Sequence, residues 1–269
     1  FVTNLYTASA LDTFLFFTNR GRVFWRKVYE LPMAGRTARG KAIVNLLELG
    51  EGEKVAAILP VADLANADDN LSVLTVTKQG RVKKTFISEY KRPLRKGKFG
   101  LTIREDDEIR SAAITSGDDE IFLVTRLGLS IHFHESDVRA MGRLAAGVKG
   151  ISLGEDDAVV GVAVLKSDDS ILTVTERGYG KRTAVAEYRL QARGGKGVFT
   201  IKTSERNGYV VGVLPVVDED QVMLVANSGK VIRMPMDTVR LIGRNTQGVR
   251  LINLEEDELV VDLSMLARE

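Results

Sequence analysis

The sequence contains no cysteine, only two histidines and five prolines, and aromatic residues make up 6% of its 269 positions. Without cysteine, disulfides and thiolate metal sites are excluded, and secretion gains no support. No apolar stretch approaches the roughly 18 residues of a membrane span. The chain opens on phenylalanine without a signal peptide or basic leader. We therefore expect a piece of a longer, cytoplasmic protein that does not enter a membrane.

A hairpin pattern is repeated along the chain. Residues 74–84 read LTVTKQGRVKK, in which apolar and polar positions alternate on both sides of a glycine turn, and this pattern predicts a β-hairpin. Similar segments recur with their turn glycines at Gly21, Gly80, Gly128, Gly178 and Gly229. A second glycine follows 17 or 19 residues after each turn, at Gly40, Gly97, Gly147, Gly195 and Gly248. Repeats of about fifty residues made of short strands are typical of propeller blades.

The repeat spans the chain from end to end. We therefore expect one all-β, propeller-like domain over residues 1–269, built of about five full repeats and a partial one. Residues 42–49, AIVNLLEL, are predicted to form a strand of the first repeat, followed by a strand over VAAILPV.

Charge is unevenly placed although the net charge is only +2. The five segments from the turn glycine to the second glycine, taken with their flanks as residues 20–41, 78–98, 126–149, 177–196 and 229–250, hold 31 of the 38 Lys and Arg but only six of the 36 Asp and Glu. Acidic residues return together after the second glycine, as at residues 105–108, 155–157 and 255–257. Because the repeat fixes these positions in space, we expect a basic zone and an acidic zone, and a basic zone of this size favours a polyanionic partner.

Three local motifs are better explained by structure than by chemistry. Residues 35–41 match a phosphate-binding loop, but Ala42 stands where Ser or Thr would hold magnesium. His132 and His134 could share a metal, but without a third local ligand an exposed strand face is the preferred interpretation. Trp25 could stack on a base, but packing between blades is preferred. We find no catalytic residues and no cofactor or metal site in this chain.

Five segments carry a family resemblance: GYGKRTAVAEY at 178–188, SDVRAMG at 136–142, IGRNTQGV at 242–249, RGKAIVNLL at 39–47 and ERNGYVVG at 205–212. They closely resemble the C-terminal domain of the A subunit of bacterial DNA gyrase, a type II topoisomerase, over essentially the whole chain. The resemblance implies a six-bladed β-pinwheel, a propeller-like ring whose blades exchange strands and whose basic rim wraps DNA.

The resemblance also implies a role inside a larger enzyme. The wrap would present DNA so that ATP-driven strand passage introduces negative supercoils. The holoenzyme would be an A2B2 heterotetramer in which the A subunit joins the B subunit, the ATPase, and it would use ATP and Mg. The catalytic tyrosine, magnesium site and ATPase would lie in other domains.

One motif departs from the family pattern. The family's hallmark box, Gln-Arg-Arg-Gly-Gly-Lys-Gly, has its nearest match at residues 191–197, where Ala192 replaces an arginine. We interpret this segment as a related repeat element, and expect the box itself before Phe1. The pinwheel is accordingly expected to have an incomplete or open first or closing blade.

Contact with DNA is expected to be mainly phosphate neutralisation, with weak sequence preference. The principal candidates are Arg81, Lys83, Lys84, Lys181, Arg182, Arg193 and Lys196, followed by Arg22, Arg26, Arg39, Lys41, Lys98, Arg233 and Arg244. If about 6 to 10 phosphates are contacted, affinity should fall by roughly 10³ to 10⁵ between 50 and 200 mM salt.

Other functions remain as alternatives. The C-terminal domain of the related topoisomerase IV is the nearest, since its ring often has fewer blades and does not wrap DNA to supercoil it. A protein-binding propeller scaffold would bind its partner at high salt. A propeller enzyme would need polar residues converging on the axis, and the sequence shows no such cluster.

Overall fold

The computed structural model describes residue 6 and residues 8–35, 40–166 and 169–266. These residues form β-strands joined by turns and short 3-10 segments, as the all-β prediction requires. The chain divides into two compact units, which are treated separately below. The N-terminal unit comprises Ala8–Gly117 and Val138–Val148, and the C-terminal unit comprises Asp118–Asp137 and Lys149–Glu269 with Phe1–Thr7.

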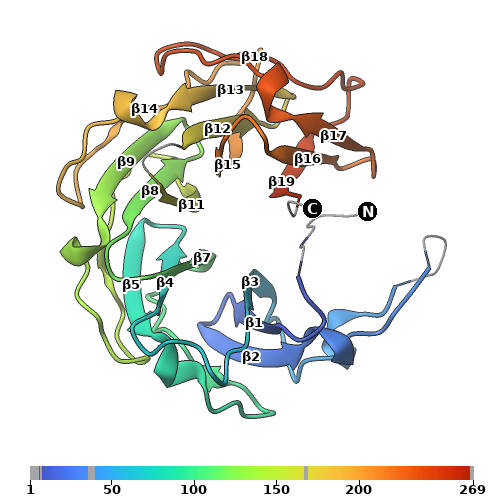
Figure 1. Ribbon diagram of the computed structural model, residues 1–269, viewed down its shortest axis with the longest axis vertical. Coiled ribbons are helices and arrows are strands. Elements are labelled where there is room, and N and C mark those ends of the chain that lie inside the picture. The colour runs from blue at the N-terminus through green and yellow to red at the C-terminus, as the bar shows by residue number, and fades with distance from the viewer. Residues whose placement is uncertain (1–5, 7, 36–39, 167–168, 267–269) are drawn as a thin grey trace. The chain divides into compact units, whose positions relative to one another are not determined.

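The described residues form five antiparallel sheets (Figure 1). The sheets have the strand orders β3-β1-β2-β6, β10-β5-β4-β7, β11-β8-β9-β14, β15-β12-β13-β18 and β17-β16-β19. The first two contain β1 (Thr13–Thr18), β2 (Arg22–Lys27), β3 (Val55–Val61), β4 (Ser72–Thr77), β5 (Arg81–Phe86), β6 (Lys98–Phe99), β7 (Ile109–Thr115) and β10 (Val148–Lys149). The other three contain β8 (Glu120–Thr125), β9 (Leu129–His134), β11 (Val159–Leu165), β12 (Ser170–Thr175), β13 (Tyr179–Ala184), β14 (Val198–Phe199), β15 (Val210–Val216), β16 (Gln221–Ala226), β17 (Val231–Pro235), β18 (Val249–Arg250) and β19 (Val260–Met265).

Two sequence predictions are corrected by these elements. The described residues hold five blade sheets, where six blades were expected, and the fifth sheet has three strands. The predicted strand over residues 42–49 is not formed, because Ile43–Asn45 makes a 3-10 turn instead. The strand predicted over VAAILPV is confirmed as β3.

Each predicted hairpin is present and is closed by its turn glycine. The five turn glycines have φ between 78° and 88°, a left-handed conformation that glycine adopts without a Cβ clash. At Gly21 a Cβ would lie 2.2 Å from the carbonyl oxygen of Leu101, so no side chain fits there. In three of the hairpins a threonine hydroxyl also accepts a backbone N–H across the turn, as when Thr77 Oγ1 accepts from Arg81 N over 3.1 Å.

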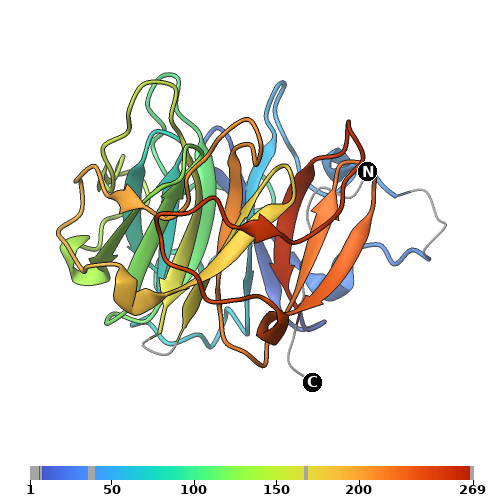
Figure 2. The same cartoon turned by 90° about the horizontal axis from the view of Figure 1, so that it is seen from above.

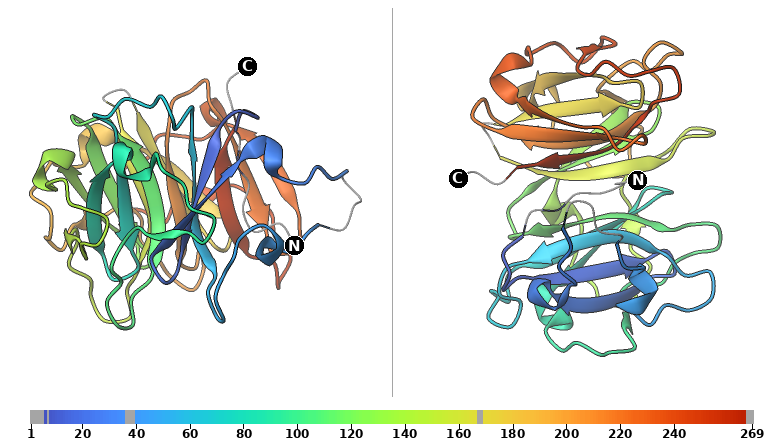
Figure 3. Two further views of the ribbon diagram at one scale, coloured as in Figure 1. Left: turned by 90° about the horizontal axis from the view of Figure 1, so that it is seen from below. Right: turned by 90° about the vertical axis from the view of Figure 1, so that its right-hand side faces the viewer.

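The core lies between successive sheets of each unit. The central strands β1, β4 and β12 are buried along their whole length, because both faces of a blade pack on neighbouring elements. In the N-terminal unit β3 contacts β7, and in the C-terminal unit β15 contacts both β11 and β19. Figure 3 shows the ribbon, coloured by residue number, from two further sides. Phe17 and Tyr90, for example, meet edge to face with ring centroids 6.1 Å apart.

The outer strand of four sheets comes from the next repeat along the chain. We call β6, β10, β14 and β18 the exchanged strands, since each pairs with the outgoing strand of the preceding hairpin. Figure 2 shows the segment that carries β18 lying across the hairpin of β12 and β13. Among the described residues the fifth sheet has no exchanged strand. This exchange matches the strand swapping expected of a pinwheel.

A left-handed glycine immediately precedes each exchanged strand. Gly97, Gly147, Gly197 and Gly248 have φ between 73° and 76°. A Cβ on any of them would lie 3.0 Å or less from an atom of the preceding hairpin, and only 2.1 Å from Ser130 O in the case of Gly197. The second glycine of the fourth repeat is therefore Gly197, and the sequence assignment to Gly195 was wrong by two residues.

Candidate nucleic-acid interface

Two of the principal DNA-binding candidates, Lys83 and Lys181, are buried. Their side chains are 1% and 0% exposed. Lys83 Nζ donates to Gly100 O over 2.5 Å and to Arg143 O over 2.7 Å. These lysines occupy the same position of their hairpins and hold the segment that follows in the next repeat. The prediction that they contact DNA is corrected, because their ammonium groups are enclosed by protein.

Burial also changes the acidity of these two lysines. Lys181 Nζ donates to Gly243 O over 2.6 Å, to Arg244 O over 2.5 Å and to Thr246 Oγ1 over 3.1 Å. Removal from water disfavours the charged form and lowers the pKa of Lys83 to about 7 and the pKa of Lys181 to about 8. The neighbouring guanidinium groups of Arg143 and Arg244 act in the same direction.

The next hairpin position is buried as well. Arg182 is 4% exposed and donates to Met236 O over 2.6 Å and to Asp218 Oδ1 over 2.6 Å. Lys84 is 9% exposed. The Arg182 guanidinium is engaged by protein acceptors, which corrects that prediction, and the burial of Lys84 argues against its contact with a phosphate. The equivalent Trp25 is also buried and donates Nε1–H to Tyr90 O over 2.9 Å, which confirms the packing interpretation of this residue.

Arg22 and Arg81, which directly follow the turn glycine, donate to the loops that lead to the exchanged strands β6 and β10. Arg22 forms an ion pair with Glu53 over 2.7 Å and donates to Lys96 O. Arg81 Nε donates to Ala146 O over 3.0 Å. Arg26 donates to the carbonyl oxygens of Trp25 and Leu46. These three arginines were predicted to contact DNA; they are half-buried, and each already donates hydrogen bonds to protein acceptors.

A third set of arginines ties one exchanged strand to the next loop. Arg143 Nη1 donates to Phe99 O over 3.0 Å, Arg193 Nη1 to Lys149 O over 2.9 Å, and Arg244 Nη1 to Phe199 O over 3.2 Å. All three precede the left-handed glycine by four residues. We call them the latch arginines. Arg193 and Arg244 were predicted to bind DNA, and the structure gives them a clear second role in positioning the loops.

The remaining candidates divide into three groups. Lys41, Lys196 and Arg233 are exposed. Lys98 is half-buried, donates to Arg92 O over 2.5 Å and lies 5.9 Å from the centre of the Trp25 ring. Arg39 lies outside the described residues.

Exposed cations gather in the loops that lead to the exchanged strands and on two of these strands, β10 and β18. We call this set the loop cations: Arg92, Arg95 and Lys96; Arg139 and Lys149; Arg189 and Lys196; Arg240 and Arg250. The side chain of Arg95 is paired with Glu48 over 2.7 Å yet remains 86% exposed. Apart from Lys196, the sequence prediction did not select them. The signal for most of them was a place between the hairpin and the second glycine, whereas Lys149 and Arg250 follow that glycine on the exchanged strands β10 and β18.

Acidic residues are placed at the hairpin turns instead. Asp107 Oδ1 accepts Gln79 N over 2.9 Å, and Asp157 Oδ1 accepts Leu127 N over 3.0 Å. Glu255 to Glu258 line a cavity of about 450 Å³ beside the turn residues Asn227 and Ser228. In these examples the carboxylates lie beside hairpin turns, whereas the loop cations lie in or next to the exchanged strands.

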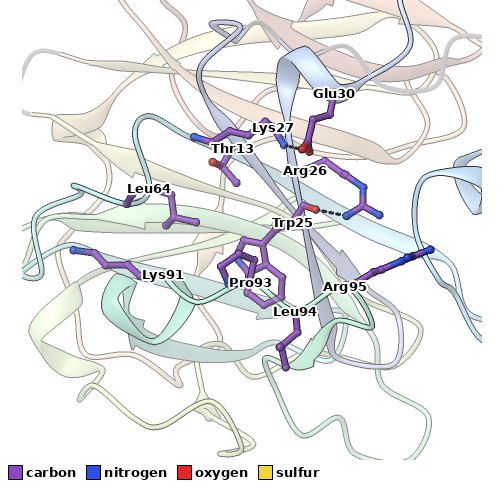
Figure 4. A pocket seen from close by; sticks show the side chains of 11 residues that line it. Thr13, Trp25, Arg26, Lys27, Glu30, Leu64, Lys91, Pro93, Leu94 and Arg95 are labelled. Atoms are coloured by element: carbon purple, nitrogen blue, oxygen red, sulfur yellow. Dashed lines mark hydrogen bonds between the residues drawn. The ribbon is translucent and has the colours of Figure 1, made fainter.

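A cavity of about 390 Å³ adjoins the first of these loops (Figure 4). Trp25, Leu64 and Pro93 line it together with Arg26, Lys27, Lys91 and Arg95. Lys91 is paired with Asp69 over 2.8 Å, and Lys27 Nζ donates to Leu11 O over 3.0 Å. Arg95 extends away from the indole in Figure 4. Lys91 and Lys27 thus have protein partners and Arg95 extends away from the cavity. We therefore treat Arg95 as a residue of the loop surface and propose no separate ligand site in this cavity.

The two histidines have separate partners. His132 is 5% exposed, and its ring nitrogens lie 3.1 Å from Tyr188 O and 2.8 Å from Glu120 Oε2. His134 contacts Ser136 and Asp118. The expectation of an exposed strand face was therefore wrong for His132. Among the described residues no three His, Asp or Glu are grouped as metal ligands, and no helix there is long and apolar enough to cross a membrane.

The family model "DNA gyrase C-terminal domain, beta-propeller" matches five segments of the chain, at residues 12–62, 72–116, 119–166, 169–216 and 220–266. These segments coincide with the five repeats. The DNA gyrase A subunit of Klebsiella oxytoca is 46% identical over 99% of this chain, and that of Clostridium acetobutylicum is 45% identical over 100% of this chain. The chain spans about a third of the length of these relatives, 30% and 32%.

Solved structures give the same match. A DNA gyrase A C-terminal domain superposes with a TM-score of 0.86 at 25% identity, over 97% of this chain and 84% of that one. A C-terminal domain of DNA topoisomerase IV superposes with a TM-score of 0.81 at 29% identity, over 96% of this chain and 80% of that one.

Proposed function

This chain belongs to the DNA gyrase C-terminal domain family, and from that premise we propose that it binds duplex DNA along its loop cations and bends it. One observation carries the proposal: exposed Lys and Arg recur in four consecutive loops, each of which leads into an exchanged strand. The buried lysines and latch arginines hold these loops against their neighbours. Lys and Arg side chains neutralise phosphates without contacting base edges. Affinity should therefore depend on the salt concentration and on how easily the DNA bends, more than on the DNA sequence.

In the whole protein we propose that this DNA-bound domain serves ATP-dependent negative supercoiling by a type II topoisomerase. The remainder of the gyrase A subunit and the ATPase-bearing B subunit, in an A2B2 assembly, would supply the catalytic tyrosine, Mg and ATP. The domain itself would contribute no catalytic residue and need no cofactor. This work on the chromosome would place the protein in the bacterial cytoplasm.

The ring itself remains part of the proposal. Strand exchange in four of the five sheets supports a pinwheel, in which each blade is completed by its neighbour. A single domain over residues 1–269 also stays a prediction.

A topology experiment tests DNA bending. The chain is bound to nicked circular DNA, the nick is ligated, and the linking number is measured after the protein is removed. We expect a linking-number shift that grows with protein concentration. The double variant Lys149→Glu and Lys196→Glu should lose it, whereas Lys166→Glu, an exposed cation outside the loops, should retain it. Binding without any shift for the unaltered chain would contradict bending.

Topoisomerase IV is the second candidate, because a C-terminal domain of that enzyme superposes over 96% of this chain. The same experiment separates the two functions. A gyrase domain should shift the linking number of the circles, whereas a domain that binds DNA without wrapping should retard the circles on a gel and leave their linking number unchanged.

A further inference from the structure

Two exchanged strands carry an exposed phenylalanine where the other two carry a cation. The second residue of each strand is Phe99 in β6, Lys149 in β10, Phe199 in β14 and Arg250 in β18. Phe99 is 56% exposed and Phe199 is 48% exposed. Lys149 and Arg250 are among the loop cations, so the equivalent phenyl groups occupy positions of the proposed DNA-binding surface.

The main chain of both phenylalanines is held on two sides. In the N-terminal unit, Phe99 pairs with Arg22 across the sheet and its carbonyl accepts the latch arginine Arg143. In the C-terminal unit, Phe199 pairs with Leu129 and its carbonyl accepts Arg244. The rings are therefore carried by ordered backbone. A surface loop without such anchors could fold an exposed ring back onto the protein.

The alternation of the strand directs each ring outward. Successive side chains of a strand point to opposite faces. Lys98 lies over Trp25 on the inner side and Val198 packs on the core, so the following phenylalanines face solvent. Leu144, the residue after Arg143, is 69% exposed, and its carbonyl accepts Thr102 Oγ1 over 2.5 Å in the segment just after Phe99. This part of the surface combines apolar area with cations.

We propose that Phe99 and Phe199 are DNA-contacting residues that pack against the deoxyribose and base edges of the bound duplex. The inference rests on the proposed DNA binding. Lys96 and Arg143 beside Phe99, and Lys196 and Arg244 beside Phe199, would bring the phosphates close to each ring. Burial of half a phenyl group adds affinity without releasing counterions, so its contribution should not depend on salt.

The test measures duplex affinity across a salt series for Phe99→Ala, Phe199→Ala and the control Tyr209→Ala. Tyr209 is 42% exposed and directly precedes β15; its N–H donates to Glu176, and its ring centre lies 4.0 Å from Cζ of Arg126, which is not one of the loop cations. Each Phe variant should weaken binding about three- to tenfold at every salt concentration, with an unchanged slope. Lys149→Ala should instead lower the slope by roughly 0.9. Circular dichroism melts of each variant report whether the fold is kept.

The outcomes separate this inference from the proposed function. A parallel loss of affinity in folded Phe99→Ala and Phe199→Ala, with Tyr209→Ala unchanged, supports contact. Affinity equal to that of the unaltered chain for both Phe variants overturns it while DNA binding stands. If the unaltered chain itself does not bind duplex, the proposed function fails and the inference falls with it.

Discussion

Lys181 Nζ lies 2.6 Å from the carbonyl oxygen of Gly243, 62 residues further along the chain. The same ammonium group also reaches Arg244 O and Thr246 Oγ1, so all three of its N–H donors are used. Lys83 makes the equivalent connection in the other unit. Both lysines were predicted from the charge pattern to bind DNA, but in the structure they hydrogen-bond one repeat to the next.

The first prediction follows from this role. Lys181→Met keeps the length of the side chain but removes three hydrogen bonds, while each acceptor keeps one other donor: Thr246 Oγ1 for Gly243 O, Thr246 N for Arg244 O and Gly248 N for Thr246 Oγ1. A hydrogen bond contributes about 0.5 to 1.5 kcal/mol net, so we expect a loss of roughly 1 to 3 kcal/mol in the free energy of unfolding. Urea denaturation monitored by fluorescence measures it. Lys196→Met, at an exposed loop position, is the control and should change stability by less than about 0.5 kcal/mol.

The second prediction concerns pH and Lys83. Its pKa is about 7 in the folded chain and is 10.5 without burial, so between these values the unfolded state binds the extra proton. Stability should therefore rise as pH increases from about 7, because protons are released on folding. Between pH 7 and 9 we expect a gain on the order of 1 to 2 kcal/mol relative to Lys83→Met, which lacks this ionisation. Equal pH dependence in the two proteins would contradict the lowered pKa of Lys83.

The sequence was informative about everything that repeats. The alternating arms and turn glycines of residues 74–84 and their four relatives predicted the hairpins, and the structure has all of them. The sequence could not tell which cations would be covered. Both Lys83 and Lys196 were predicted to be exposed. Lys83, however, is covered by the next repeat, where its Nζ donates to the carbonyl oxygen of Arg143, 60 residues further along the chain. Such coverage is a tertiary property that local pattern does not contain.

The third prediction separates charge from positioning at Arg193. Its Nε donates to Asp137 O over 2.8 Å while Nη1 donates to Lys149 O over 2.9 Å. Arg193→Lys keeps the charge, but a single ammonium cannot reproduce the guanidinium fork. We expect faster amide hydrogen exchange over residues 189–199 and a smaller linking-number shift, with the salt slope of DNA binding retained. A matched Arg189→Lys variant, exposed in the same loop, should leave the exchange rates unchanged.

The fourth prediction separates the loop cations from exposed cations elsewhere by the salt dependence of DNA binding. Removing one phosphate contact lowers the slope of log affinity against log salt by roughly 0.9. Lys149→Ala and Lys196→Ala should each do so, and the exposed Lys54→Ala, outside the loops, should not. Fluorescence anisotropy of a labelled duplex between 50 and 200 mM salt gives the slopes. Unchanged slopes for both loop variants would place the DNA elsewhere on the chain.

The last prediction concerns two glycines in the segment GGKG. Gly197 has φ +76°, and a Cβ there would lie 2.1 Å from Ser130 O. Both the left-handed backbone and the contact must change in Gly197→Ala, so β14 should separate from β9.

Gly195→Ala is the matched control, because its Cβ would meet nothing closer than Ile131 Cδ1 at 3.8 Å. We expect Gly197→Ala to lose about 2 kcal/mol or more of unfolding free energy and most of its DNA bending. Gly195→Ala should stay close to the unaltered chain in both. Thermal unfolding and the nicked-circle experiment, both done on this pair of variants, test the prediction. If the two variants behave alike, Gly197 is not the residue that places β14 against β9. The proposed DNA-binding surface would then lose the structural feature that positions its loops.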